Sequence, residues 1–243
     1  VADASLTSVP HHLRAEINTP ILGHEDVPEL QRVIRAVRRA GGKVDSCCGV
    51  HIHTSHHLLN AKAVANLARI VYKNEDLIFA AFGVTPERMA RYAKKMPDEF
   101  ARKIISRKPR NMDELNKWWY GRYNANPTRY DSSRYVGINL NALIFRGAVE
   151  YRYFQFRKNK LHAGELRAWM VFCMALTAKA INAKAASGKR REYVEDCGRF
   201  DFRVFISHGL GLKSPEHHNV RMHLLARLKG DSAWKDPARR RTA

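Results

Sequence analysis

The sequence has little cysteine, no long apolar run and few acidic residues, and each shortage argues against a class of protein. Its 243 residues include four cysteines, whose spacing matches neither a disulfide framework nor a zinc site. It contains no stretch of about eighteen apolar residues, so we expect no membrane-spanning helix. The first residues lack the basic and apolar regions of a signal peptide. These absences predict a cytoplasmic protein with reduced thiols.

The shortage of acidic residues leaves a large positive charge. Asp and Glu number 23 against 43 Lys and Arg, which gives a formal net charge of +20. A charge of this size attracts nucleic acid, nucleotide phosphates, acidic peptides or an anionic membrane surface. Much of it lies in clusters that are usually solvated, at 32–39, 102–110, 189–191 and 239–241. The charge therefore predicts an anionic partner without identifying it.

The order of apolar periodicities predicts an α+β fold, and the length allows one large core. Alternating or extended patterns predict strands at 14–18, 48–55, 135–140 and 148–156. Helical spacing predicts helices at 28–40, 55–83, 161–186 and 215–228, with shorter helices between 85 and 122. No internal repeat is present.

The stretch from Gly49 to Ser55 carries two histidines at alternate positions. In a strand, His51 and His53 share one face while Val50 and Ile52 point into the core. Two such imidazoles can share a metal ion, or one can bind a metal while the other meets a phosphate. Gly49 would let a ligand or another backbone come close. The alternative is that both histidines are structural.

A second predicted strand carries Glu150 and Arg152 on a common face. Burying a carboxylate and a guanidinium there is costly without partners, although they could also form an ordinary ion pair within the strand. Arg134 and Arg146 flank the predicted strands within reach of a phosphate, and Asn139 would suit a polar site lining. Together the two strands predict a site for a metal-bound phosphate.

These motifs resemble those of a known superfamily. Gly49–Ser55 is similar to the His-x-His strand of glutamine synthetase and the glutamate–cysteine ligases, and Glu150-Tyr151-Arg152 to the Glu-x-Arg strand of the same fold. With Glu16, Thr19–Leu22 and Tyr135–Leu140 in that order, the chain resembles the putative amidoligase family, the compact carboxylate–amine ligases of this superfamily. The resemblance covers about residues 1–180.

The resemblance implies a curved antiparallel sheet of the glutamine synthetase type, with helices packed on one face, that holds ATP and Mg²⁺ or Mn²⁺. ATP would phosphorylate a carboxylate, and an amine would displace the phosphate to form an amide. The implied metal ligands are Glu16, His51 and Glu150. The implied groups at the nucleotide, of which Arg152 and His53 would also be catalytic, are His53, Arg152, Arg146, Arg134 and Asn139.

Two features of the chain are not explained by the resemblance, namely residues 191–243 and the absence of one expected metal-binding strand. We expect residues 1–190 to form the ligase-like domain and residues 191–243 a basic helical extension or cap. The superfamily's first strand carries a Gly-x-Glu-x-Glu stretch of metal ligands that has no counterpart in this sequence. Either residues upstream of Val1 supply it, or the protein is an inactive relative. The expected partners are a carboxylate and an amine, as small molecule, peptide or protein, and an anionic macromolecule.

Two other functions remain open on the sequence alone. The charge supports a basic nucleic-acid-binding protein, although no zinc-finger, RNA-recognition or helix-turn-helix signature is present. A zinc hydrolase would need a third nitrogen or sulfur ligand near the histidine pair, and none can be placed. Saturable binding of Mg·ATP would favour the ligase, whereas steep salt dependence on nucleic acid would favour the first alternative.

Overall fold

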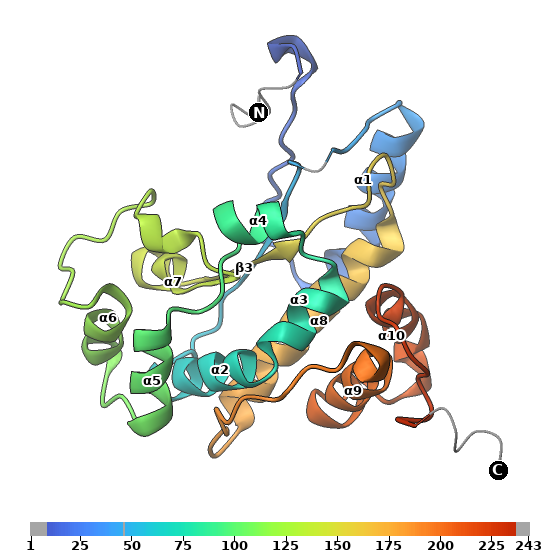
Figure 1. Cartoon of the computed structure of the whole chain (residues 1–243). Helices are drawn as coiled ribbons and strands as arrows, with labels where there is room; N and C mark the ends of the chain where they lie inside the picture. Colours follow the sequence, from blue (N-terminus) through green and yellow to red (C-terminus); the bar gives the residue numbers. More distant parts are fainter. Residues whose placement is uncertain (1–8, 46, 237–243) are drawn as a thin grey trace.

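The computed structural model describes residues 9–45 and 47–236 (Figure 1). Its sheet has three strands, β1 (Val50–Thr54), β2 (Ile138–Asn139) and β3 (Val149–Phe154), in the order β1-β3-β2. Both pairs of neighbouring strands are antiparallel. The α+β class and an antiparallel sheet around the two predicted motifs are therefore confirmed.

Helices are the main regular element in the rest of the described chain. They are α1 (Val27–Arg39), α2 (Ala61–Lys73), α3 (Glu75–Phe82), α4 (Pro86–Arg91), α5 (Asp98–Ser106), α6 (Met112–Tyr120), α7 (Leu140–Arg146), α8 (Ala163–Asn182), α9 (Gly198–Val204) and α10 (His218–Leu225). The long helix α8 packs against α1, α2, α10 and β1 and so lies at the centre of the molecule (Figure 1). Within residues 9–45 and 47–236, no helix combines the length and apolarity needed to cross a membrane.

One face of the sheet is fixed to α8 by packing and by hydroxyl groups. Val149 and Tyr151 of β3 are fully buried. The Tyr151 hydroxyl and Thr177 Oγ1 of α8 are 2.8 Å apart, and Thr54 Oγ1 of β1 lies 2.9 Å from the same oxygen. Because side chains alternate along a strand, the two histidines of β1 and Glu150 and Arg152 of β3 lie on the opposite face.

The predicted helix over 55–83 is divided in two. Asn74 lies between α2 and α3, and its side-chain amide donates to the carbonyl of Ile70 at 2.9 Å. Such a side-chain bond competes with the helical backbone ladder and favours a break. The helix also begins later than predicted, because Asn60 rather than Ser55 caps it by accepting from the amide of Ala63 at 3.0 Å.

Two predicted strands differ from the structure. The strand at 14–18 is wrong: this stretch is irregular, and no strand pairs with it in the described part of the chain. The strand at 135–140 is reduced to Ile138 and Asn139, because Asn139 Oδ1 accepts from the amide of Ala142 at 3.2 Å and starts α7. A side chain that caps a helix ends the extended run before it.

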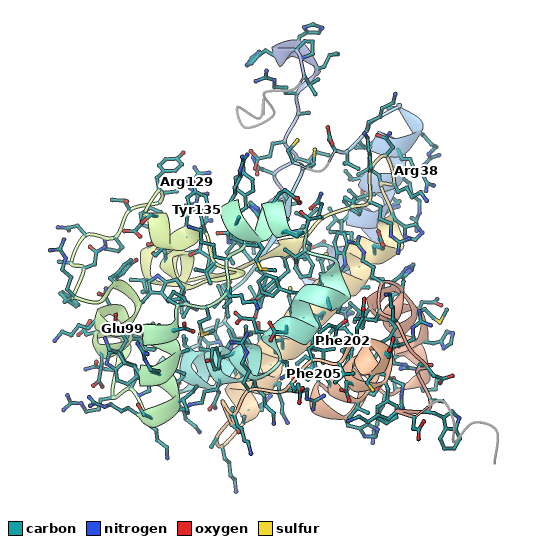
Figure 2. All side chains as sticks on the ribbon, viewed as in Figure 1. Arg38, Glu99, Arg129, Tyr135, Phe202 and Phe205 are labelled. Atoms are coloured by element: carbon teal, nitrogen blue, oxygen red, sulfur yellow. The ribbon has the colours of Figure 1, made fainter. Side chains whose placement is uncertain are left out.

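The segment after residue 190 shares the core of the rest of the molecule. Phe202 of α9 is fully buried, with its ring centroid 6.1 Å from that of Phe82 in α3 and 6.0 Å from that of Phe172 in α8. Phe205 lies beside it at the lower right of Figure 2. The apolar core therefore runs across the domain boundary that was predicted at residue 190.

Candidate active site

The strand register sets three polar residues in a row across the sheet. Glu150 of β3 lies directly opposite His53 of β1 on one side and Asn139 of β2 on the other. Side chains that are directly opposite in an antiparallel pair share a face of the sheet and lie within contact distance. This register places the predicted imidazole and carboxylate side by side.

A bulge between β1 and β3 adds two more polar residues. Ile52 pairs with Tyr151 but Val50 pairs with Phe154, so that His51 alone lies opposite two residues of β3. The first of those two residues is Arg152. A bulge bends the strand and re-aims the side chains beside it. We call His51, His53, Asn139, Glu150 and Arg152 the Glu150 cluster.

Glu150 is the centre of this cluster, and it is only 3 % exposed. Its Oε1 accepts from Arg152 Nη1 at 2.7 Å and lies 3.1 Å from His51 Nδ1. Its Oε2 accepts from Asn139 Nδ2 at 2.5 Å. Burial alone would raise the pKa of Glu150, but the hydrogen bond from His51 and the charge of Arg152 outweigh it and hold the pKa well below its usual range. Glu150 is therefore a buried, ionised anchor for three donors.

The two imidazoles are neutral at pH 7 and are the same tautomer, with the proton on Nδ1. Burial lowers the pKa of both, and it lowers that of His53 to about 4, although about a third of each side chain is exposed. Because a carboxylate only accepts, the proton of His51 is on Nδ1, and Nε2 keeps a free lone pair. His53 Nε2 lies 3.4 Å from Arg146 Nη2, which can only donate, so the proton of His53 is on Nδ1.

Arg88 of α4 belongs to the same site and was missed in the sequence. It is 4 % exposed, and its Nη2 donates to the carbonyl of Arg152 at 3.0 Å. A Cβ atom at Gly49 would lie 2.5 Å from that Nη2, so the glycine admits a guanidinium rather than the predicted ligand or backbone. Burial and the charge of Arg152 lower the pKa of Arg88 to about 10, which leaves it cationic. No local sequence pattern distinguishes Arg88 from the other 42 Lys and Arg residues of the chain.

Two further predicted arginines border the cluster. Arg134 is half-buried, and its Cζ lies 5.6 Å from the ring centroid of Tyr135. Arg152 lies over the same ring at 5.6 Å, and its Nε donates to the carbonyl of Tyr92 at 2.9 Å. Arg146 is exposed and reaches His53. Seven of the eight predicted site residues therefore gather at this face of the sheet.

The eighth residue, Glu16, is not held by a strand. It lies in the irregular stretch between the short 3₁₀ turns His11–Leu13 and His24–Asp26, and it is exposed. The sheet therefore does not fix Glu16 in a position to bind a metal ion with His51 and Glu150.

The donor set of the cluster does not make a complete metal site. Both oxygens of Glu150 already accept hydrogen bonds. The lone pair of His53 Nε2 faces Arg146, so among the two histidines the lone pair of His51 Nε2 is the one left open to a ligand. In the described residues, no three His, Cys, Asp or Glu side chains are arranged to hold an ion. The metal roles of His51 and Glu150 remain predictions. The geometry favours His51 as a ligand that Glu150 orients, an arrangement common in metalloproteins.

Two pockets lie away from the cluster. One, of 640 Å³, is lined by α3 and residues 190–193, and the other, of 520 Å³, by the end of α6 and the loop that follows it. Neither has a residue of the Glu150 cluster in its lining. A ligand of the cluster would therefore lie on the sheet face, with the exposed edges of His51 and His53.

Comparison with known proteins gives one match. A family model described as a putative amidoligase enzyme matches residues 1–177. No curated protein and no solved structure matches the chain. The matched range contains the Glu150 cluster and Arg88, and it ends before α9 and α10.

Proposed function

Because the chain belongs to the putative amidoligase family, we propose that it is an ATP-dependent ligase that joins a carboxylate to an amine. The terminal phosphoryl group of ATP would move to a carboxylate oxygen, which leaves ADP and an acyl phosphate. The amine nitrogen would then attack the acyl carbon, the bond from that carbon to the phosphate oxygen would break, and the nitrogen would lose a proton. The products are an amide, ADP and inorganic phosphate.

The proposal rests on an excess of guanidinium groups on one face of the sheet. Arg88, Arg134, Arg146 and Arg152 lie there, and within the described residues their one ion pair is that of Arg152 with Glu150. The neutral imidazoles add no charge. Unbalanced positive charge at a partly buried face favours a ligand with several negative charges. A triphosphate carries such charges, and phosphoryl transfer needs them held and stabilised.

The side chains suit different parts of that reaction. Arg152 is fixed by Glu150, by the Tyr92 carbonyl and by the Tyr135 ring, so its planar fork is pre-organised for the oxygens of the transferring phosphoryl group. His53 can donate its Nδ1 proton to a nucleotide phosphate, beside Arg146. The free Nε2 of His51 can accept the proton that the amine loses. Asn139 holds Glu150 in place.

The divalent ion is proposed as a companion of ATP. Mg²⁺ or Mn²⁺ bound to the phosphates would offset their charge. Because the described residues do not complete a metal site, we assign no step to an ion held by the protein alone. We propose further that β1, β3 and β2 are the counterpart of part of a glutamine synthetase-type sheet, since one strand carries the histidine pair and its neighbour the Glu-x-Arg motif.

Calorimetric titration with Mg·ATP tests this proposal. Wild type should bind saturably, and Arg152→Lys should weaken binding by about tenfold, because a point charge cannot replace a fixed planar fork. Arg38→Lys is the matched control, since Arg38 is exposed on α1 and lies well away from Tyr135, which borders the cluster (Figure 2). It should leave the affinity within about twofold of wild type. Absence of saturable binding, or equal losses in both variants, would contradict the proposal.

A further inference from the structure

Guanidinium groups and tyrosine rings alternate from the Glu150 cluster to the surface. Arg152 and Arg134 each lie 5.6 Å from the ring centroid of Tyr135. Arg134 also lies 5.3 Å from the centroid of Tyr130, and Arg129 lies 5.5 Å from that same ring. We call these five residues the Arg–Tyr ladder.

The ladder arises from a short stretch of sequence. Arg-Tyr occurs three times between α6 and β2, at 122–123, 129–130 and 134–135, and the last two pairs form the ladder together with Arg152 of β3. Exposure falls along it, from 74 % at Tyr130 to 3 % at Arg152. Figure 2 shows Arg129 and Tyr135 on the same side of the molecule, away from Phe202 and Phe205. The ladder therefore leads from an exposed loop to the buried arginine of the site.

The stacked guanidinium groups keep their hydrogen-bonding edges. A cation–π contact uses the flat face of the group, and the N–H donors at its edge stay available for a carboxylate. In the part of the chain that the structure describes, neither Arg129 nor Arg134 forms an ion pair with a carboxylate. The Arg134 Nε atom is buried with no hydrogen-bond partner there. Arg129 and Arg134 are thus two positive charges without an ion-pair partner, whereas Arg152 at the inner end is paired with Glu150.

From this arrangement, and on the basis of the function proposed above, we propose that the ladder binds an acidic chain. The ligand would be a peptide or polymer with several carboxylates, one of which is led to Arg152 as the group to be activated. Arginine pairs with carboxylates in a planar, two-point geometry that a series of guanidinium edges can repeat. The carboxylate substrate would then be a macromolecule rather than a single small acid.

A nucleic acid fits the inner part of the ladder less well. Bases bind by stacking on open aromatic faces. Tyr135 already carries two guanidinium groups and meets the edge of Tyr92 at 6.4 Å, so its faces are taken. Tyr130 also carries two guanidinium groups, at 5.3 and 5.5 Å, but it is 74 % exposed and is therefore the ring of the ladder most open to a base. Carboxylates need no ring face and can contact the guanidinium edges of Arg129 and Arg134.

Fluorescence anisotropy with the full chain tests the proposal. The probes are a labelled oligoglutamate peptide, an oligoglutamine peptide of the same length and a single-stranded oligodeoxynucleotide of similar charge. The variant combines Arg129→Gln and Tyr130→Leu, both exposed positions, and the control is Arg38→Gln. We expect the affinity for oligoglutamate to fall by about tenfold in the double variant and by less than about twofold in the control. Thermal melts check that both variants are folded.

The outcomes separate this proposal from the function itself. Binding of oligoglutamine as tight as that of oligoglutamate would overturn the proposal. It would also be overturned if the oligonucleotide bound more tightly than oligoglutamate and lost the same affinity in the double variant. If oligoglutamate does not bind while Mg·ATP does, the ladder proposal fails and the proposed ligase stands. If oligoglutamate binds and Mg·ATP does not, the surface stands and the ligase function fails. The double variant should bind Mg·ATP with an affinity within about twofold of wild type, since neither residue contacts the Glu150 cluster.

Discussion

Glu150→Gln tests the charge balance of the candidate site. The substitution keeps the shape of the side chain but removes the negative charge beside Arg152, and both residues are 3 % exposed. A carboxylate accepts from Arg152, His51 and Asn139 at once, whereas an amide offers one acceptor oxygen and one NH₂ group. Asn139 cannot turn its amide round without losing the bond by which its oxygen caps α7. One donor is therefore left without an acceptor.

The expected loss of stability is large. Breaking a buried ion pair by removing one partner costs about 3–5 kcal/mol, because the other charge stays buried without a counter-ion. For a chain of this size, that corresponds to a fall in Tm of about 10 °C. Inorganic phosphate should raise the Tm of the variant more than that of wild type, because it supplies the missing negative charge. Ligase turnover should fall by about a hundredfold, since Arg152 is no longer held.

Thermal melts of wild type and variant, with and without phosphate, measure these effects. Glu99→Gln is the control: Glu99 is exposed on α5, pairs with Lys103 at 2.7 Å and lies apart from Tyr135, which borders the sheet site (Figure 2). It should leave Tm unchanged, as exposed ion pairs stabilise little. A Tm for Glu150→Gln within about 2 °C of wild type would refute the idea that Glu150 balances a buried guanidinium.

Four further substitutions test other parts of the structure. Burial raises the pKa of Glu75 to about 7. Between about pH 4.5 and 7 the folded state therefore keeps a proton that the unfolded state has lost. The free energy of unfolding should fall by about 3 kcal/mol over that range and stay low at higher pH. Glu75→Gln should remove this loss, so that urea unfolding shows it equal to wild type at pH 5 and more stable at pH 8; a parallel pH dependence in both proteins would contradict the assignment. Gly49→Ala should lower the free energy of unfolding by about 1–2 kcal/mol, because the new methyl group displaces the Arg88 guanidinium. Gly137→Ala should lower it by about 3 kcal/mol, because the methyl group overlaps the buried ring of Tyr153. Thermal melts in which Gly49→Ala is the less stable variant would contradict this packing. Phe202→Ala should cost about 3–5 kcal/mol in urea unfolding, because α9 is part of the main core, and a loss below about 1 kcal/mol would indicate a separate C-terminal unit.

The alternation of side chains along a strand made half of the site predictable. His51 with His53, and Glu150 with Arg152, each stand two residues apart, and a strand places such pairs on one face whatever surrounds it. The structure confirms both strands and brings the pairs together. Apolar alternation also predicted that the other face of the sheet is buried.

Features that depend on distant contacts were not predictable. The bulge that sets His51 opposite Arg152 depends on how two strands far apart in the sequence pair, and nothing within either strand reports it. Arg88 reaches the site because Gly49 leaves room for it, a contact between segments with no shared pattern. The break at Asn74 depends on whether one amide turns to solvent or to a carbonyl. Each of these features depends on tertiary contacts, which the propensities of the local sequence do not determine.

Isotope transfer from carboxylate to phosphate tests the proposed reaction most directly. Pools of carboxylates enriched in ¹⁸O, including oligoglutamate, are incubated with the protein, Mg·ATP and pools of amines, and the released phosphate is analysed by mass spectrometry. An acyl phosphate keeps a carboxylate oxygen between carbon and phosphorus, and amine attack at the acyl carbon sends that oxygen away with the phosphate. We therefore predict ADP, an amide and inorganic phosphate that carries one ¹⁸O atom. Formation of AMP and pyrophosphate, or of phosphate without the label, would contradict this account.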